Sequence, residues 1–243
     1  MAINLTEGGN IFKLADGQPA TQRIALANIV PTVQWLEQLT GLNLVDNMLG
    51  STGKKESSGD LDLGVDATKI SKDVLIQQLL SKGIDAKDIR KTGDSVHLKT
   101  PILGDSSNGY VQTDFMFSDN PEFQHFSYAG AGEGQFKGVH RNILLASIAK
   151  AQGLKWSPKF GLVNRETNEV ITNDPAEIAR QLVGGTAQDL GSVEAILNKL
   201  KGRADYEQLV ADAREAFARE NLSLPESVQV HEGSAQWFRN FML

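Results

Sequence analysis

The stretch GSTGKKESSGDLDLGVD, residues 50–66, contains the pattern that decides how the rest of the sequence is interpreted. Its first half is rich in small and basic residues, and its second half places carboxylates at alternate positions. Side chains on a β-strand point alternately to opposite faces. The spacing therefore predicts a strand with Asp60, Asp62 and Asp66 on one face, and with leucine and valine side chains on the other, where they can pack into a core.

Asp60 and Asp62 form a close acidic pair in this strand, separated by two residue rises, or about 6–7 Å. Like charges at this distance repel each other unless a cation lies between them. Mg²⁺ prefers carboxylate and phosphate oxygens as ligands. Two alternatives stay open: an exposed edge strand with a solvated polar face, and a calcium loop of the EF-hand type. Gly64 and Ser71 disfavour the calcium loop, because they stand where an oxygen ligand and the closing glutamate belong.

The loop that precedes the acidic pair has the composition of a phosphate-binding loop. Small residues let backbone N–H groups approach a polyphosphate, and hydroxyl and ammonium groups add donors. The spacing differs from a Walker A loop, because the Gly-Lys-Ser or Gly-Lys-Thr ending is missing. A phosphate loop directly before paired carboxylates predicts a site for a nucleotide that carries its metal ion. The loop residues of interest are Gly50, Ser51, Lys54, Lys55 and Ser58.

A third carboxylate stands in the segment YVQTDFMF, residues 110–117. Alternation in this predicted strand places Val111 and Phe115 on one face, and Asp114 on the other together with Gln112. A site that clamps two metal ions needs such a third carboxylate. The alternative interpretation is an aspartate at the edge of a strand. His97 and His125 are interpreted as structural or surface residues.

The composition limits the chemistry and the expected location. The chain has 243 residues, of which 40% are hydrophobic, as in an ordinary globular protein. It has no cysteine, which excludes disulfides, thiolate catalysis and cysteine zinc sites. It has no apolar run of about 20 residues, so we expect no membrane span. The N-terminal sequence lacks the pattern of a signal peptide, so we expect a cytoplasmic location.

The charge is distributed unevenly along the chain. The formal net charge is −6, which excludes a bulk polyanion binder of the basic-tail type. Residues 134–165 nevertheless contain six cations and no acid. This zone predicts one face for an anionic ligand. A solvated charged face is the alternative.

Helices and strands mix without a regular βαβ rhythm, so the predicted fold class is α+β. Helices are expected near 21–42, 71–82, 137–152, 192–200 and 204–220, and one more opens at the capping box of Asp174. Strands are expected near 47–49, 61–65, 88–91, 95–100 and 110–117, followed by a small β-meander at 154–156, 160–163 and 169–172.

These motifs resemble the DNA polymerase beta-like nucleotidyltransferase superfamily. Its signature is Gly-Ser, a short basic loop, Asp-x-Asp on a strand and a third aspartate on a later strand. Residues 50–66 resemble the first part and QTDFMF the second. The segment KGVHRNILLASIAKAQGLKWSPKFGLVN, residues 137–164, is similar to the region that follows in family X polymerases. The Thr-Gly-Ser triplet of those enzymes is replaced here by a glycine-rich AGAGEGQFKG.

The resemblance implies a fold and a division of the chain. It implies a palm-like mixed sheet flanked by helices, with a C-terminal helical region. The expected parts are an N-terminal arm (1–20), a palm-like catalytic domain (21–128), a glycine-rich loop with a helix and β-meander (129–173) and C-terminal helices (174–243). Only about 50 residues precede Gly50, too few for the DNA-holding modules of those polymerases, so we expect non-templated transfer.

The resemblance also implies roles for single residues. Asp60 and Asp62 would bind two Mg²⁺ ions, for which Mn²⁺ can substitute, and Asp114 would bind one of them and help to deprotonate the attacking hydroxyl. The loop residues Ser51, Lys54, Lys55 and Ser58 would hold the triphosphate. The start of the later helix would contact the sugar and phosphate of the nucleotide, because a helix N-terminus favours anions. The residues concerned there are Lys137, His140, Arg141 and Asn142.

The implied function is that of a metal-dependent nucleotidyltransferase. It would move a nucleoside monophosphate from an NTP, with ATP as the expected substrate, to an acceptor hydroxyl and release pyrophosphate. RNA, a protein hydroxyl or a small molecule remain open as acceptors. The alternative is a catalytically inactive nucleotide-binding or assembly module of the same fold, which the missing Thr-Gly-Ser triplet and the unmatched C-terminal third would fit.

Overall fold

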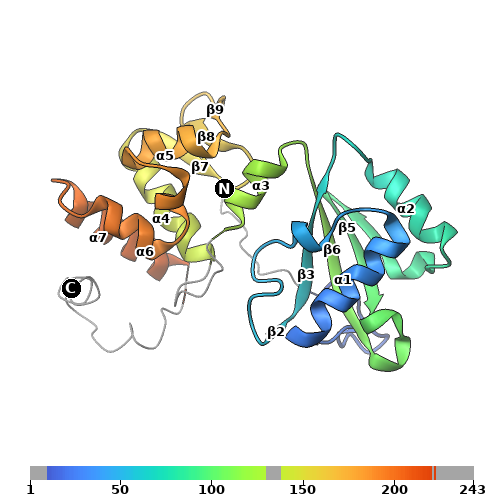
Figure 1. Ribbon diagram of the computed structural model, residues 1–243. Helices are drawn as coiled ribbons and strands as arrows, with labels where there is room; N and C mark the ends of the chain where they lie inside the picture. The colour runs from blue at the N-terminus through green and yellow to red at the C-terminus, as the bar shows by residue number, and fades with distance from the viewer. Residues whose placement is uncertain (1–9, 130–137, 221, 223–243) are drawn as a thin grey trace. The chain divides into compact units, whose positions relative to one another are not determined.

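The computed structural model describes residues 10–129, 138–220 and 222 (Figure 1). It has mixed α and β structure with a mixed sheet flanked by helices, so the predicted fold class is confirmed. The chain separates into two compact units, one up to His125 and one from Phe126 onward. This division lies three residues before the domain end expected at residue 128. Each unit is described by itself.

The first unit is built on a four-stranded sheet with the strand order β3-β6-β5-β4. These strands are β3 (Asp60–Asp66), β6 (Tyr110–Ser118), β5 (Ser95–Pro101) and β4 (Ile89–Thr92). β3 and β6 are parallel, and the other two pairs are antiparallel. The two strands with the sequence's acidic residues are therefore direct neighbours, although about 45 residues separate them along the chain.

Two helices cover the apolar face of this sheet, α1 (Leu26–Thr40) and α2 (Lys72–Ser81) (Figure 1). Alternation turns every second residue of each strand toward them. One continuous core results, and burying its apolar surface is the main stabilising contribution in this unit. Its fully buried members include Ile29, Val33 and Leu36 of α1, Leu75 and Leu79 of α2, and Leu61, Leu63, Val96, Leu98, Val111 and Phe115 of the sheet.

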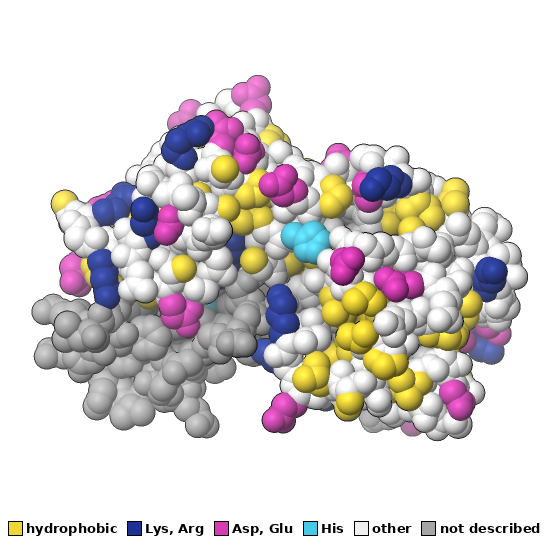
Figure 2. Space-filling view, in the orientation of Figure 1, with side chains coloured by type: hydrophobic (Ala, Val, Ile, Leu, Met, Phe, Trp, Pro, Cys, Tyr) yellow, Lys and Arg dark blue, Asp and Glu magenta, His cyan; other side chains and the backbone are white. Residues whose placement is uncertain are grey.

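The helix α1 is shorter than the expected range of 21–42. It begins after β1 (Ile24–Ala25), which pairs with β2 (Ser57–Ser58), and it ends at Gly41, whose φ of 69° stops the helix. Two of its apolar side chains face solvent, since Leu26 and Val30 are 44% and 38% exposed. Figure 2 shows hydrophobic side chains at the surface over this helix.

The segment before the phosphate loop is not the strand expected at 47–49. Residues Val45–Asn47 form a 3₁₀ turn, η1, and Met48 makes a single antiparallel bridge to Leu63 of β3. This segment therefore contacts the edge of β3 through an isolated bridge and does not form a strand of the sheet. Further 3₁₀ turns in this unit are η2 (Ala86–Asp88), η3 (Ile102–Gly104) and η4 (Ser106–Asn108).

The described part of the predicted N-terminal arm, residues 10–20, is attached to the sheet. Phe12 is 5% exposed, and the backbone N–H of Ile11 donates to Oε1 of Gln112 on β6 at 3.0 Å. The arm therefore contributes to the core of the first unit.

The second unit contains the expected small meander and the C-terminal helices. β7 (Leu154–Ser157), β8 (Gly161–Asn164) and β9 (Val170–Thr172) form an antiparallel sheet beside α4 (Gly138–Ala151), which confirms the meander. The helical elements that complete the described chain are α3 (Pro121–Ser127), which crosses from the first unit into the second, α5 (Pro175–Val183), η5 (Ala187–Leu190), α6 (Val193–Leu200) and α7 (Tyr206–Arg219).

Side chains cap the start of one helix in each unit, and the cap at Asp174 is the predicted one. Ser71 accepts from the N–H of Val74 at the start of α2, and Asp174 accepts from the N–H groups of Ala176 and Glu177 at the start of α5. None of the described helices combines the length and the hydropathy that a bilayer crossing requires.

Candidate metal centre

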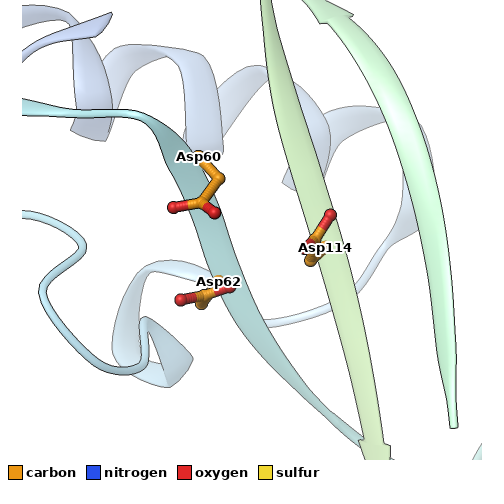
Figure 3. A group of neighbouring side chains, drawn as sticks. All are labelled: Asp60, Asp62 and Asp114. Atoms are coloured by element: carbon orange, nitrogen blue, oxygen red, sulfur yellow. The ribbon is translucent and has the colours of Figure 1, made fainter. Parts of the chain in front are cut away.

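Three carboxylates meet on the open face of the first unit's sheet, opposite the helices. Asp60 and Asp62 project from β3 and Asp114 from β6, as Figure 3 shows. The parallel register places Asp62 directly beside Asp114 and Asp60 beside Gln112. One ligand oxygen from each carboxylate lies within 4.8 Å of the other two. No other trio of acidic or imidazole side chains among the described residues meets this criterion.

The electrostatics of this trio are unfavourable without a cation. Burial, together with the charges of Asp60 and Asp114, raises the pKa of Asp62 from 3.8 to about 8. At neutral pH Asp62 therefore retains a proton in the metal-free protein. Three carboxylate oxygens are the hard ligands that Mg²⁺ and Mn²⁺ prefer, and a bound cation would take the place of that proton. The residues present fit a divalent metal.

The start of the phosphate loop lies against Asp62. The hydroxyl of Thr52 accepts from the backbone N–H of Asp62 at 3.0 Å, and the N–H of Leu49 donates to the carbonyl of Asp62 at 2.8 Å. Gly50 has a φ of 58°, and a Cβ built there would lie 3.4 Å from Oδ2 of Asp62. Glycine is suited to this position because the positive φ disfavours a residue with a side chain. The structure thus brings the predicted Gly50 and Ser51 beside the carboxylates.

The remaining loop residues differ in accessibility. Lys54 and Lys55 are exposed, as a contact to a triphosphate requires. Ser58 is 4% exposed, because β2 pairs with β1, so its hydroxyl has little surface to offer a ligand. Sequence reasoning missed Arg23, whose Nε and Nη2 donate to the side chain and carbonyl of Ser57 at 3.1 and 2.9 Å. It adds a third cation to this loop.

Two polar side chains contact Asp114, and sequence reasoning gave neither a role in the site. Nδ1 of His97 lies 2.8 Å from Oδ1 of Asp114, and Nε2 of Gln112 donates to Oδ2 at 3.3 Å. The sequence alone predicts a structural or surface role for His97. Alternation along the strand 95–101 places His97 on the open face of the sheet, and this is the signal that the sequence contains. The pairing register, which sets His97 against Asp114, cannot be read from the sequence.

Of the four residues predicted at the start of α4, the structure describes three, and none of these three is exposed. His140 and Arg141 are 1% and 0% exposed, which contradicts the expectation that their side chains contact a nucleotide. The ring of His140 packs edge-on against Phe217 of α7, with ring centroids 5.3 Å apart. Oδ1 of the half-buried Asn142 accepts from the indole of Trp156 at 3.1 Å. Lys137 lies outside the described residues.

Arg141 is a structural residue of the second unit. Its guanidinium donates to the main-chain carbonyls of Leu190, Ser127 and Ala129, and it lies 4.8 Å from the ring centroid of Phe126. Burial lowers the pKa of Arg141 to about 10, which leaves it charged at neutral pH. The sequence placed this residue in a polar first turn, but tertiary packing encloses that turn.

No family model matches the chain, and no curated protein matches it significantly. The interpretation of the carboxylate site therefore depends on the geometry of this chain.

Proposed function

We propose that the protein is a metal-dependent nucleotidyltransferase, which moves a nucleoside monophosphate from an NTP to an acceptor hydroxyl and releases pyrophosphate. One observation carries this proposal. The carboxylates of Asp60, Asp62 and Asp114 converge directly beside a glycine-containing loop with exposed lysines. The resemblance of residues 50–66 to the signature of nucleotidyltransferases supports the same assignment.

In this proposal Asp60 and Asp62 hold two Mg²⁺ ions, and Asp114 is a ligand of one of them. Bound Mg²⁺ supplies positive charge for the phosphate oxygens and favours ionisation of the attacking hydroxyl. The protein supplies the arrangement. Its sheet fixes the separation of the carboxylates, and the loop 50–52 fixes the backbone of Asp62. Little covalent chemistry is required of the side chains, because phosphoryl transfer depends mainly on positioning and charge.

The loop binds the triphosphate of the nucleotide. The side chains of Ser51, Lys54, Lys55 and Arg23 supply hydroxyl, ammonium and guanidinium donors around one short turn. Arg23 is anchored to Ser57 through Nε and Nη2, so its position relative to the loop is fixed before a ligand binds. Such preorganised cations stabilise the charge that develops on the leaving pyrophosphate.

The chemical step is an in-line displacement at the α-phosphorus. The acceptor oxygen forms a bond to this phosphorus, and the bond to the bridging oxygen of the β-phosphate breaks with its electron pair leaving on pyrophosphate. The proton of the acceptor hydroxyl passes to the carboxylate of Asp114 and from there to water. ATP is the proposed nucleotide, and an RNA end or a protein hydroxyl is the proposed acceptor.

A nucleotide-transfer screen tests this proposal. The full chain with Mg²⁺ or Mn²⁺ is incubated with each α-³²P-labelled NTP, in separate reactions with total RNA, mixed protein or no acceptor. The double variant Asp60→Ala/Asp62→Ala removes the acidic pair. Asp66→Ala is the matched control, because Asp66 lies on the same strand and face but outside the trio.

Label in one acceptor reaction that disappears in the double variant and persists in Asp66→Ala supports the proposal and identifies the acceptor class. Transfer that survives in the double variant excludes this site. Binding of Mg-ATP to the wild type without any release of pyrophosphate would favour the inactive nucleotide-binding module instead.

A further inference from the structure

We propose that His97 is a positioning residue of the metal centre, which holds the carboxylate of Asp114 so that its Oδ2 faces a bound cation. This inference rests on the proposed function and identifies an additional residue of the same site. It starts from the β5–β6 register, in which His97 stands directly opposite Asp114. Directly opposed residues on one sheet face are the closest cross-strand neighbours.

The side chains of His97 and Asp114 are largely buried, and the hydrogen bond between them is short. The side chains of His97 and Asp114 are 13% and 14% exposed, and Nδ1 lies 2.8 Å from Oδ1. This distance is that of a strong hydrogen bond to a carboxylate. An enclosed bond of this kind holds the torsion of the carboxylate more firmly than a solvated one, because water competes less for either partner.

The imidazole ring is held at both nitrogens. Its Nε2 lies 2.6 Å from the hydroxyl of Thr92, the last residue of β4. In the neutral ring Thr92 donates to Nε2, and in the charged ring Nε2 donates to Thr92. In both states Nδ1–H donates to Asp114, because an ionised carboxylate can only accept. The chain Thr92–His97–Asp114 therefore orients the carboxylate in either charge state of the histidine.

The two oxygens of Asp114 are held unequally. Oδ1 accepts the short bond from His97, whereas Oδ2 accepts, from the residues that the structure describes, only the 3.3 Å bond from Gln112. A hydrogen bond of that length is weak and is readily replaced. Gln112 is itself anchored, since its Oε1 accepts from the N–H of Ile11. We therefore assign Oδ2 as the oxygen that Asp114 offers to a cation.

Positioning matters here because the trio repels itself. A freely rotating Asp114 would turn its charge away from Asp60 and Asp62 in the metal-free protein. A carboxylate that is already held in place avoids this reorganisation when the metal binds. Outer-shell partners of metal ligands typically contribute about 10–100-fold to metal affinity. We expect this range for the donor on His97.

The test compares His97→Leu with His97→Asn in the full chain. The two replacements are nearly isosteric, but only asparagine retains a donor close to the position of Nδ1. Mn²⁺ affinity is measured from the electron paramagnetic resonance signal of free Mn²⁺, without nucleotide and without turnover. His125→Leu is the matched control, because His125 is an exposed histidine of α3 that contacts Asn47 and not the trio.

We expect the dissociation constant for Mn²⁺ to rise about 10–100-fold in His97→Leu and to stay within about threefold of the wild type in His97→Asn and His125→Leu. Thr92→Val, which removes only the outer hydrogen bond, should raise it by a smaller factor. Urea unfolding identifies a variant that has lost its fold. A purely structural role for His97 would reduce stability but would not separate asparagine from leucine in Mn²⁺ affinity.

Wild-type and His97→Leu chains that bind Mn²⁺ equally tightly would overturn the inference and leave the proposed function intact. His97→Asn that is as weak as a folded His97→Leu would overturn it as well, because the retained donor would then have no effect. A wild-type chain that binds no Mn²⁺ would overturn the metal centre itself and, with it, both proposals. If His97→Leu does not fold, an unchanged affinity in Thr92→Val together with a normal one in a His97→Ala chain overturns the inference.

Discussion

The substitution Asp62→Asn should stabilise the metal-free protein at neutral pH while it removes the proposed metal site. In the wild type, burial and the charges of Asp60 and Asp114 raise the pKa of Asp62 to about 8, against 3.8 for an unperturbed carboxyl. The folded protein therefore keeps Asp62 protonated at pH 7, whereas the unfolded chain ionises it. Asparagine is neutral in both states and removes this preference for the unfolded chain.

The magnitude follows from the two pKa values. At pH 7 the ionisation of an aspartate with a pKa of 3.8 favours the unfolded chain by about 4 kcal/mol, at about 1.4 kcal/mol per pH unit. This is an upper limit, because water that enters the site and counter-ions screen the trio. We expect about half of it, roughly 2 kcal/mol, in the free energy of unfolding. At about 4 °C for each kcal/mol, the melting temperature of the first unit should rise by about 8 °C.

The pH dependence has a definite sign. A carboxyl whose pKa is raised in the folded state does not favour unfolding at pH values below its unfolded pKa of 3.8, so the stability of the wild type that depends on this group is fully present there. That contribution is lost as the pH rises toward the folded pKa of about 8, and above this value the loss is complete. The free energy of unfolding of Asp62→Asn should thus be close to that of the wild type at pH 4. The difference in favour of the variant should grow between pH 4 and pH 8.

Urea unfolding at a series of pH values, in buffer with EDTA, measures this difference. Added Mg²⁺ should reverse it, because a ligand at 100 times its dissociation constant stabilises only the protein that binds it, here by about 2.7 kcal/mol. The reasoning is refuted if metal-free Asp62→Asn at pH 7–8 is no more stable than the wild type, or if its relative stability does not change between pH 4 and pH 8.

Three further substitutions test the supports of the site and the fold. Thr52→Val removes the hydroxyl that accepts from the N–H of Asp62, so the free energy of unfolding should fall by about 1–2 kcal/mol, and an unchanged urea midpoint would count against this bond. Arg141→Met leaves main-chain carbonyls of the second unit without their donor and should destabilise it by about 3 kcal/mol, with unchanged nucleotide affinity of the folded protein by calorimetry; the opposite pattern would restore its predicted nucleotide contact. Gly64→Ala places a Cβ 2.9 Å from Oε1 of Gln124 and should lower stability by about 1–2 kcal/mol, which Gln124→Ser in the same chain should recover.

The carboxylate strand could be predicted because its information is local. Alternation in residues 60–66 and 110–117 is enough to place Asp60, Asp62 and Asp114 on open faces and their apolar neighbours in a core. The prediction for Gly50 was local too, because it follows from the small and basic residues of one short loop before the strand. What the sequence could not specify is that the two strands are parallel neighbours.

The misplaced residues depend on contacts between distant segments. His97 acquires its role only through the antiparallel register that sets it against Asp114, and no local pattern encodes that register. The prediction that His140 and Arg141 contact a nucleotide depends on their place at a helix start, because a helix N-terminus favours anions. In the structure that helix start is packed against Leu190 and Phe217, which come from elements about 50 and 75 residues later in the chain.

A comparison of Asp62 with Asp66 distinguishes a metal centre on β3 from a solvated polar face. Both lie on the same face of the same strand, and β3 is at an edge of the sheet. The hydroxyl and N–H of Thr68, with Lys69, hold the pKa of Asp66 below its ordinary value, as expected for a partly exposed and well-paired carboxylate. Asp62 shows the opposite shift.

A solvated edge strand would give both aspartates the environment of Asp66. The environment of Asp62 arises because the loop 50–52 encloses it on one side and Asp114, held by His97, faces it on the other. The fold therefore holds an acidic trio that lowers its own stability. The supporting contacts come from three separate segments, the loop 50–52, β5 and β6. A divalent cation is the ligand that would convert this unfavourable arrangement into a stabilising one, because it neutralises the charge that burial and proximity make costly.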